Sequence, residues 1–157
     1  MNKKILIFSI IIIALLTGCD KNKDFCIHVI DVGQADSILI TTPSNKNMLI
    51  DGGDEDSAKI IKSYLKSKKV KNLDVVIATH PDSDHIGSLD YIIDNFDVEK
   101  IYMPNQTTDS ECYINLIDSC NKKNLKVNYL SKDDSFNLDD STNIYVLSPR
   151  CHRSEER

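Results

Sequence analysis

The 157-residue sequence has no tryptophan, 6% aromatic residues, five glycines and four prolines. This composition excludes collagen-like and low-complexity proteins, and a hydrophobic content of 41% excludes a wholly disordered chain. With so few aromatic side chains, the core must consist mainly of Ile, Leu and Val. The chain also has no excess of basic residues: 19 Lys and Arg against 24 Asp and Glu give a net charge of −5. Overall charge therefore does not favour nucleic-acid binding, and the length fits a single domain.

The amino-terminal segment has the pattern of an export signal. Lys3 and Lys4 precede an apolar run over residues 5–16, which is too short to span a bilayer but suits a signal peptide. Leu16-Thr17-Gly18-Cys19 follows and resembles the lipobox of bacterial lipoproteins. We expect residues 1–18 to be removed, Cys19 to be lipidated and residues 19–24 to form a tether. The protein would then be exported and anchored to the outer face of the cell membrane; a plain membrane anchor and a cleaved secretory signal are the alternatives.

The other cysteines show no metal-binding or redox spacing. Cys26, Cys112, Cys120 and Cys151 match neither a zinc knuckle nor a thioredoxin motif. Cys112 and Cys120 are about two helical turns apart, which is too far along one helix for a disulfide. We expect these thiols to be small core or surface residues.

Hydrophobic periodicity after residue 24 predicts a layered α/β fold. An antiparallel meander is expected first, followed by helices that alternate with strands. The predicted strands are 25–32, 37–42, 48–51, 73–78, 98–103, 125–130 and 143–147. The predicted helices cover 54–68, the apolar positions from Leu89 to Phe96, and a segment opened by a capping box at residues 108–111.

The end of the sequence has no periodicity. Ser148 and Pro149 are followed by a polar stretch over residues 150–157. Because this tail comes directly after a predicted strand, we expect a domain over residues 25–149 that is incomplete, with an unstructured tail at 150–157.

The segment with the most chemical information is residues 79–85, Thr-His-Pro-Asp-Ser-Asp-His. It follows a strand predicted to be buried, and loops at the carboxyl ends of such strands commonly carry the chemistry of α/β folds. His80, Asp82, Asp84 and His85 offer imidazole and carboxylate donors, which suit zinc, manganese or iron. The alternative is an acidic helix cap with two surface histidines, which explains Asp84 but not the pair of histidines.

The motif His80-x-Asp82-x-Asp84-His85 resembles the metal-binding signature of the metallo-β-lactamase fold superfamily, with Asp82 in place of a histidine. The phrase at residues 28–37, His-Val-Ile-Asp-Val-Gly-Gln-Ala-Asp-Ser, resembles the hydrolase domain of the ComEC family of competence proteins. The phrases at 49–53 and 86–87 fit as well, so the resemblance covers residues 25–149 in three ordered motifs.

This resemblance implies the amino-terminal portion of an αββα sandwich with two divalent ions, zinc or manganese. By it, His80 and Asp82 serve one ion, Asp84 and His85 serve the other, and Asp84 orients or deprotonates the attacking water. Asp51 would hold residues 79–85, the ligand loop, in place. Without the resemblance, Asp51-Gly52-Gly53 would be interpreted as a simple turn. Asp31 and Asp36 would line the site.

The implied activity is hydrolysis of a phosphodiester, with nucleic acid as substrate, by metal-bound hydroxide. The membrane, through Cys19, is the other expected partner, and no protein partner is inferred. The superfamily takes further ligands from a T-G-D phrase and an H-H-G phrase, and neither occurs here. A truncated, non-catalytic remnant that binds metal weakly is therefore one alternative, and a lactone, thioester or β-lactam hydrolase is another.

Two charged stretches have simpler interpretations. Lys59, Lys62, Lys66 and Lys69 are spaced as one helix face, which we interpret as solvated, with contact to nucleic-acid phosphates as the alternative. The acidic stretch at residues 133–140 lacks the glycine and the final glutamate of a calcium-binding EF-hand, so we expect a surface loop.

Overall fold

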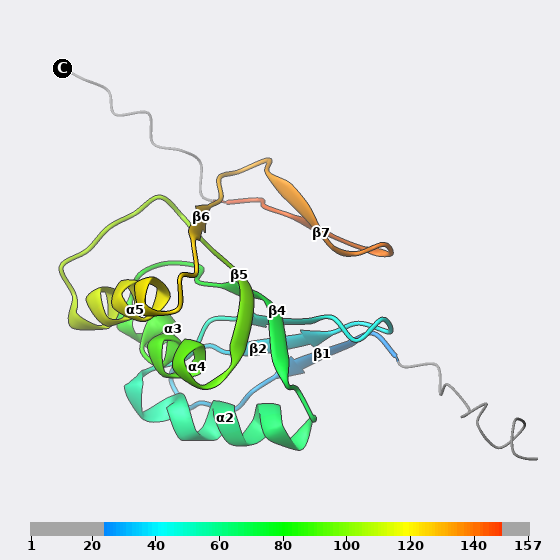
Figure 1. Cartoon of the computed structure of the whole chain (residues 1–157), viewed down its shortest axis with the longest axis horizontal. Helices are drawn as coiled ribbons and strands as arrows, with labels where there is room; N and C mark the ends of the chain where they lie inside the picture. The colour runs from blue at the N-terminus through cyan, green and yellow to red at the C-terminus, as the bar shows by residue number, and fades with distance from the viewer. Residues whose placement is uncertain (1–23, 149–157) are drawn as a thin grey trace, which may run out of the picture.

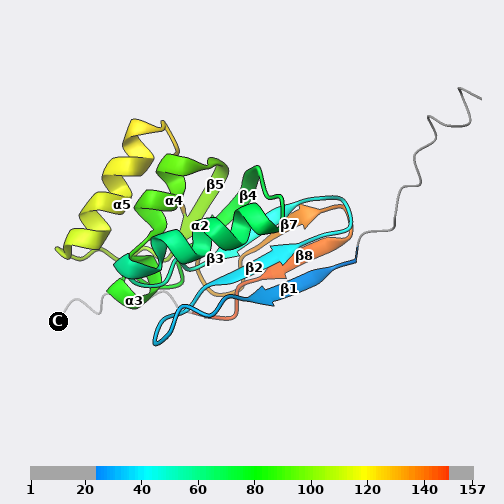
Figure 2. The ribbon, with the colours of Figure 1, turned by 90° about the horizontal axis from the view of Figure 1, so that it is seen from below.

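The computed structural model describes residues 24–148, which form a six-stranded mixed sheet, helices on one of its faces and a two-stranded hairpin on the other (Figures 1 and 2). The sheet order is β1-β2-β3-β4-β5-β6. The predicted signal peptide, most of the predicted tether including Cys19, and the predicted tail at 150–157 lie outside the described residues. Within residues 24–148, the helices are too short or too polar to cross a bilayer.

The first three strands form the predicted meander. They are β1 (Cys26–Val29), β2 (Ile38–Thr41) and β3 (Asn47–Ile50), and each neighbouring pair is antiparallel. From β3 onward the pairs are parallel, through β4 (Asn72–Ile77), β5 (Asp97–Met103) and β6 (Val127–Tyr129). The switch is expected, because helical crossovers connect the later strands.

The three predicted helical segments are present in the predicted order, and the short helix α3 (Ser83–Ile86) after the buried strand β4 was not predicted. The other helices are η1 (Glu55–Ser57), α2 (Ala58–Ser67), α4 (Leu89–Asn95) and α5 (Glu111–Lys122). The predicted capping box at residues 108–111 is wrong in detail. Helix α5 begins at Glu111 with Ser110 as its N-cap, while the hydroxyl of Thr108 accepts a hydrogen bond from the Ser110 amide.

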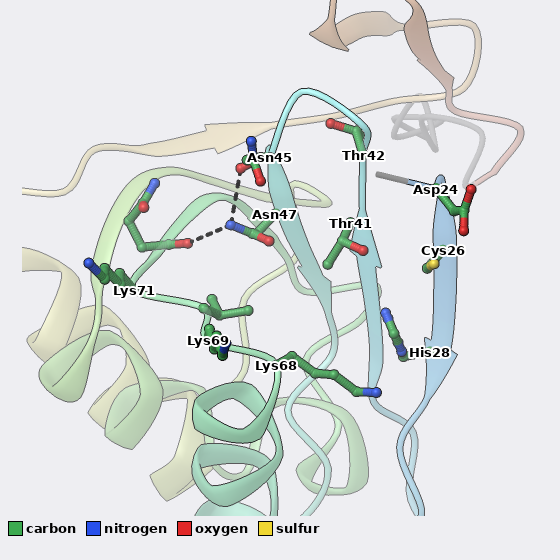
Figure 3. A pocket seen from close by; sticks show the side chains of 12 residues that line it. Asp24, Cys26, His28, Thr41, Thr42, Asn45, Asn47, Lys68, Lys69 and Lys71 are labelled. Carbon is green, nitrogen blue, oxygen red and sulfur yellow. Dashed lines mark hydrogen bonds between the residues drawn. The ribbon is translucent and has the colours of Figure 1, made fainter. Parts of the chain in front are cut away.

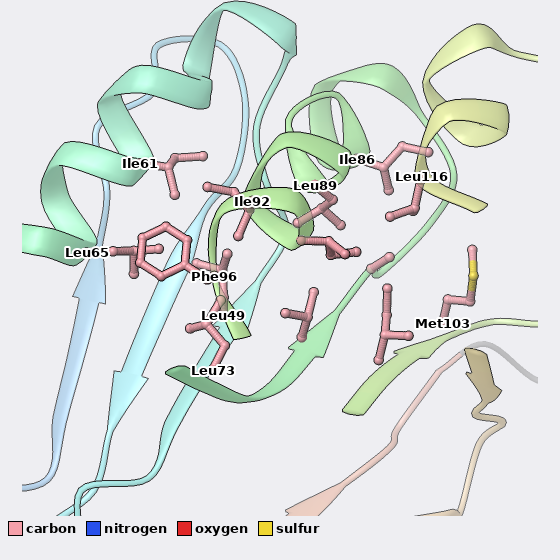
Figure 4. Packing of buried hydrophobic residues seen from close by; sticks show 14 of the residues in the cluster. Leu49, Ile61, Leu65, Leu73, Ile86, Leu89, Ile92, Phe96, Met103 and Leu116 are labelled. Carbon is pink, nitrogen blue, oxygen red and sulfur yellow. The ribbon is translucent and has the colours of Figure 1, made fainter. Parts of the chain in front are cut away.

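The main core lies between the sheet and the helices. Leu49, Leu73 and Ile101 from the strands pack against helix residues such as Ile61 and Leu89, all fully buried (Figure 4). The expectation of an aliphatic core is therefore confirmed for the described chain. Cys112 and Cys120 are buried and Cys26 is half-buried; all three are free thiols, in accordance with their spacing.

The opposite face of the sheet is covered by a hairpin that the sequence did not predict in full. Strand β7 (Ser135–Asp139) pairs with β8 (Thr142–Tyr145), and Leu138 and Phe136 pack on Ile40, Met48 and Val75. The interpretation of residues 133–140 as a surface loop is therefore wrong, because two apolar side chains at alternating positions suffice to bury one face of this strand.

This mixed α/β architecture agrees with the predicted metallo-β-lactamase-like fold. It also determines where chemistry can occur. The carboxyl ends of β3 and β4 meet at one end of the sheet, where the backbone continues into Asp51 and into residues 78–85.

Candidate metal site at the carboxyl end of the sheet

The ligand loop starts directly after the buried strand β4. Ala78 donates a backbone hydrogen bond to Tyr102, and the loop then turns into α3, where Asp82 is the N-cap residue. The amides of His85 and Ile86 donate to the Asp82 carbonyl at 3.0 Å. This single helical turn brings His80 and His85 together, with their ring centroids 3.7 Å apart.

Asp51 is the buried centre of the site. Its Oδ2 lies 2.8 Å from His85 Nδ1, and its carboxylate also accepts the Thr79 amide at 2.8 Å and the Thr79 hydroxyl at 2.6 Å. Asp51 has a φ of +59°, in the left-handed region that Asp tolerates better than most residues. The residue thus ties the end of β3 to the loop after β4.

These contacts fix the protons on both imidazoles. A carboxylate can only accept, so His85 Nδ1 carries the proton in the bond to Asp51. The Thr79 hydroxyl gives its single proton to Asp51, so in its 3.0 Å contact with His80 Nδ1 the ring nitrogen is the donor. In the neutral state, both histidines therefore present an unprotonated Nε2, which is the form that ligates metals.

Three carboxylates lie near these Nε2 atoms. Asp82 Oδ2 is 3.6 Å from His80 Nε2, while Asp84 Oδ2 and Asp36 Oδ2 are 3.8 and 3.9 Å from His85 Nε2. The side chains of Asp36, Asp82 and Asp84 are more than half exposed, whereas that of His85 is 14% exposed. The three exposed carboxylates are therefore accessible to a bound ion, while the His85 ring is fixed by its hydrogen bond to the buried Asp51.

Backbone hydrogen bonds join the three segments of the site. The Asp36 amide donates to the Asp84 carbonyl, the Gly53 amide to the Asp36 carbonyl, and the Gly52 amide to the His85 carbonyl. Gly87 has no room for a side chain, because a Cβ there would lie 2.5 Å from the Ser83 carbonyl oxygen and 2.6 Å from Asp54. The Gly52, Gly53 and Gly87 positions of the sequence motifs thus allow close packing behind the ligand loop.

The structure divides the predicted site residues into two groups. His80, Asp82, Asp84, His85 and Asp51 lie together, and Asp36 joins them nearer to His85 than expected for a residue that only lines the site. The Asp31 carboxylate instead accepts a hydrogen bond from the Gly33 amide within its own turn. Sequence reasoning gave no role to Thr79, although its position between a buried strand and His80 was the available signal.

The donor chemistry fits a divalent cation: two imidazoles with free Nε2 atoms, one of them oriented by a carboxylate, and three acidic side chains beside them. Across residues 24–148, however, no three His, Cys, Asp or Glu side chains converge closely enough to enclose an ion. Instead, His80 stands with Asp82, and His85 stands with Asp84 and Asp36. With the ligands predicted from the sequence alone, each ion would have two protein ligands, fewer than the three usual for catalytic zinc.

Comparison with known proteins agrees with this fold and donor set. The model of the metallo-beta-lactamase superfamily matches residues 30–110, which include strands β2 to β5, the ligand loop and helices α2 to α4. The chain belongs to this superfamily. It is also similar to ComE operon protein 3 of Bacillus subtilis (strain 168), with 24% identity over 142 residues, or 80% of this chain. The chain corresponds to 18% of the length of that protein.

Proposed function

We propose that this chain is a membrane-anchored, metal-dependent hydrolase of the ComEC-like type, which acts on phosphodiesters such as DNA. The single observation that carries the proposal is the hydrogen-bonded chain Thr79–Asp51–His85, with His80 attached to the same hydroxyl. Side chains that only cap a helix need no buried carboxylate behind them. Orientation of imidazoles by a carboxylate is typical of metal sites.

Each residue then has a defined role. His80, Asp82, Asp84 and His85 would hold the divalent ions, zinc or manganese, and Asp36 would be a further candidate ligand. A bound divalent ion would supply a hydroxide nucleophile at neutral pH, because it lowers the pKa of the water it binds to about 7. Asp84 is exposed beside His85 and can orient the attacking water or accept its proton, while Asp51 stays buried and keeps the His85 ring in place.

An activity assay tests this proposal. The full chain, supplied with zinc or manganese, is mixed with bis-p-nitrophenyl phosphate and with single-stranded DNA, and Asp84→Asn is compared with Asp133→Asn, an exposed Asp outside the site. We expect turnover that Asp84→Asn reduces by at least tenfold and that Asp133→Asn preserves. Equal rates in the two variants would contradict the assigned role of Asp84.

The number of donors favours a second candidate function. A non-catalytic protein that binds metal weakly would have the same oriented histidines but too few ligands around each ion. Metal binding without turnover on any substrate would support this candidate.

A cavity beside the site supports testing substrates other than phosphodiesters. It has a volume of about 360 Å³ and is lined by Thr79 and by apolar side chains that include Ile77, Met103 and Ile144. Such a lining can hold the apolar part of a lactone, thioester or β-lactam. A chromogenic β-lactam and a thioester therefore belong in the same assay.

The location is part of the proposal. Export and lipid attachment at Cys19 would place the described domain outside the cell, next to the membrane. Incorporation of radiolabelled palmitate by the wild-type chain, and its loss in Cys19→Ser, would support the anchor. Labelling that persists in Cys19→Ser would contradict it.

A further inference from the structure

The end of the sheet opposite the metal site has a concave, basic surface. A pocket of about 560 Å³ lies there, lined on one side by Lys68, Lys69 and Lys71 and on the other by the start of β1 and by the β2–β3 turn (Figure 3). The three lysines are exposed. Residues 57–73 contain six lysines and no acidic residue, although the whole chain is acidic.

The neighbouring acidic side chains leave this positive charge largely intact. Asp74 follows the lysines, but it is buried and already paired with Lys46 at 2.7 Å. Asp24, at the rim, is the acidic residue that lines the pocket. The pKa of His28, across the pocket, is lowered first by burial and second by the positive charge of Lys68. The charge of Lys68 is therefore felt on the other side of the pocket.

The pocket lies where the described chain begins. Asp24 and Cys26 line it, whereas the ligand loop follows the far end of β4 (Figures 2 and 3). Strand β4 spans six residues, so the two ends of the sheet are about 20 Å apart. Cys19 is five residues before Asp24 in the sequence, and five residues reach at most about 18 Å.

We propose that the surface formed by Lys68, Lys69 and Lys71 docks on the anionic headgroups of the membrane that holds the amino terminus. Membrane-proximal lysines attract acidic lipids. Docking at this end of the sheet directs the ligand loop away from the bilayer, toward the medium. The inference rests partly on the attachment at Cys19 proposed above.

Charge placement favours a membrane over nucleic acid as the partner. A nucleic-acid substrate would have to reach the ligand loop. The exposed charged side chains there are the acidic Asp36, Asp82 and Asp84, and the pocket lysines are too far away to hold the substrate at that loop. The pocket lysines lie at the other end of the sheet, near Asp24, and the sequence just before Asp24 contains two more lysines, Lys21 and Lys23.

The test compares two triple variants with the same loss of charge. K68Q/K69N/K71Q removes the pocket lysines, with Asn at Lys69 because φ there is +61°. K100Q/K122Q/K126Q removes three exposed lysines outside the pocket lining and is the control. Each full chain is titrated with vesicles of phosphatidylcholine alone and of phosphatidylcholine mixed with phosphatidylglycerol. The ratio of the two affinities cancels the contribution of the apolar amino terminus.

We expect the wild type and the control to prefer anionic vesicles by about tenfold or more, in a salt-sensitive manner, and the pocket variant to lose most of this preference. Circular dichroism verifies that each variant is folded. An unchanged preference in the pocket variant, or an equal loss in the control, would overturn the proposal.

Two further measurements distinguish docking through the lysines from attachment through Cys19 and from nucleic-acid binding. Cys19→Ser should retain the preference for anionic vesicles, because the preference comes from the lysines and not from the lipid. Failure of the anchor and failure of the docking surface are therefore distinguishable. Loss of single-stranded oligonucleotide binding in the pocket variant, with its vesicle preference intact, would assign the surface to nucleic acid and overturn the membrane proposal.

Discussion

The Asp51 carboxylate and the His85 imidazole form a 2.8 Å hydrogen bond between the end of β3 and the loop after β4. Asp51 is 3% exposed, and Thr79 holds its carboxylate from the other side. Because Asp51 is fixed in the buried end of the sheet, its hydrogen bond to Nδ1 fixes the orientation of the His85 ring and so of the metal-binding Nε2.

Asp51→Asn should weaken metal binding with little effect on folding. Asparagine tolerates the positive φ at this position, and its Oδ1 can still accept the hydrogen bond from the Thr79 amide. The amide NH2 in place of Oδ2 cannot accept from His85 Nδ1, and the charge that makes His85 a stronger ligand is lost. We expect zinc or manganese affinity to fall by about 10- to 100-fold, measured by isothermal titration calorimetry. Asp139→Asn, in the hairpin, is the matched control. Equal affinities in these two variants would argue against the orienting role of Asp51.

Gly87→Ala should destabilise the domain by about 3 kcal/mol, because its Cβ would meet the backbone at Ser83 and Asp54. Gly33→Ala is the comparison. Gly33 has φ +78° with open space around it, so the cost there is about 1 kcal/mol of backbone strain. Urea denaturation measures both values. A Gly87→Ala protein as stable as Gly33→Ala would show that the packing behind the ligand loop is looser than described.

The Cys120 thiol should make stability depend on alkaline pH. Burial raises its pKa from 9.0 to about 11. Because the folded-state pKa is above the unfolded value, the contribution is fully present below about pH 9 and is lost as the pH rises toward 11. The loss amounts to about 2–3 kcal/mol.

The measurement for Cys120 is urea unfolding at pH 8 and at pH 10.5, in the wild type and in Cys120→Ala. The wild type should lose more stability than the variant between the two pH values. Identical losses would show that Cys120 does not titrate differently on unfolding.

The hairpin β7–β8 should depend on one aromatic contact. The Phe136 ring stacks on Tyr102 of the sheet, with centroids 4.6 Å apart and an interplanar angle of 18°. Phe136→Ala should cost about 2 kcal/mol and accelerate amide exchange in the hairpin. Tyr145→Ala, in the same hairpin but 70% exposed, should cost less than about 0.5 kcal/mol. The reverse order would mean that the hairpin is held elsewhere.

Much of the fold was predictable because its signals are local. The meander, the buried strand β4 and the apolar faces of α2, α4 and α5 each follow from hydrophobic spacing. Strand β7 was missed because Phe136 and Leu138 are surrounded by four aspartates, and only the apolar side chains of β2, β3 and β4 make their burial favourable.

The site was predictable only in part. The segment 79–85 carries its own donors in sequence, so His80 and His85 could be found directly. The proximity of Asp36 to His85 depends on backbone hydrogen bonds to Gly53 and Asp84, which join segments distant in sequence. No periodicity in the sequence encodes such a contact.

The most direct test of the central claim is the metal content of the purified full chain after incubation with zinc or manganese and removal of free ion. The wild type is compared with the double variant His80→Ala, His85→Ala, and with His28→Ala, which removes a histidine from the opposite end of the sheet. We expect the wild type and His28→Ala to retain metal and the double variant to retain at most a tenth as much. Equal metal content in all three proteins would contradict the assignment of the ligand loop.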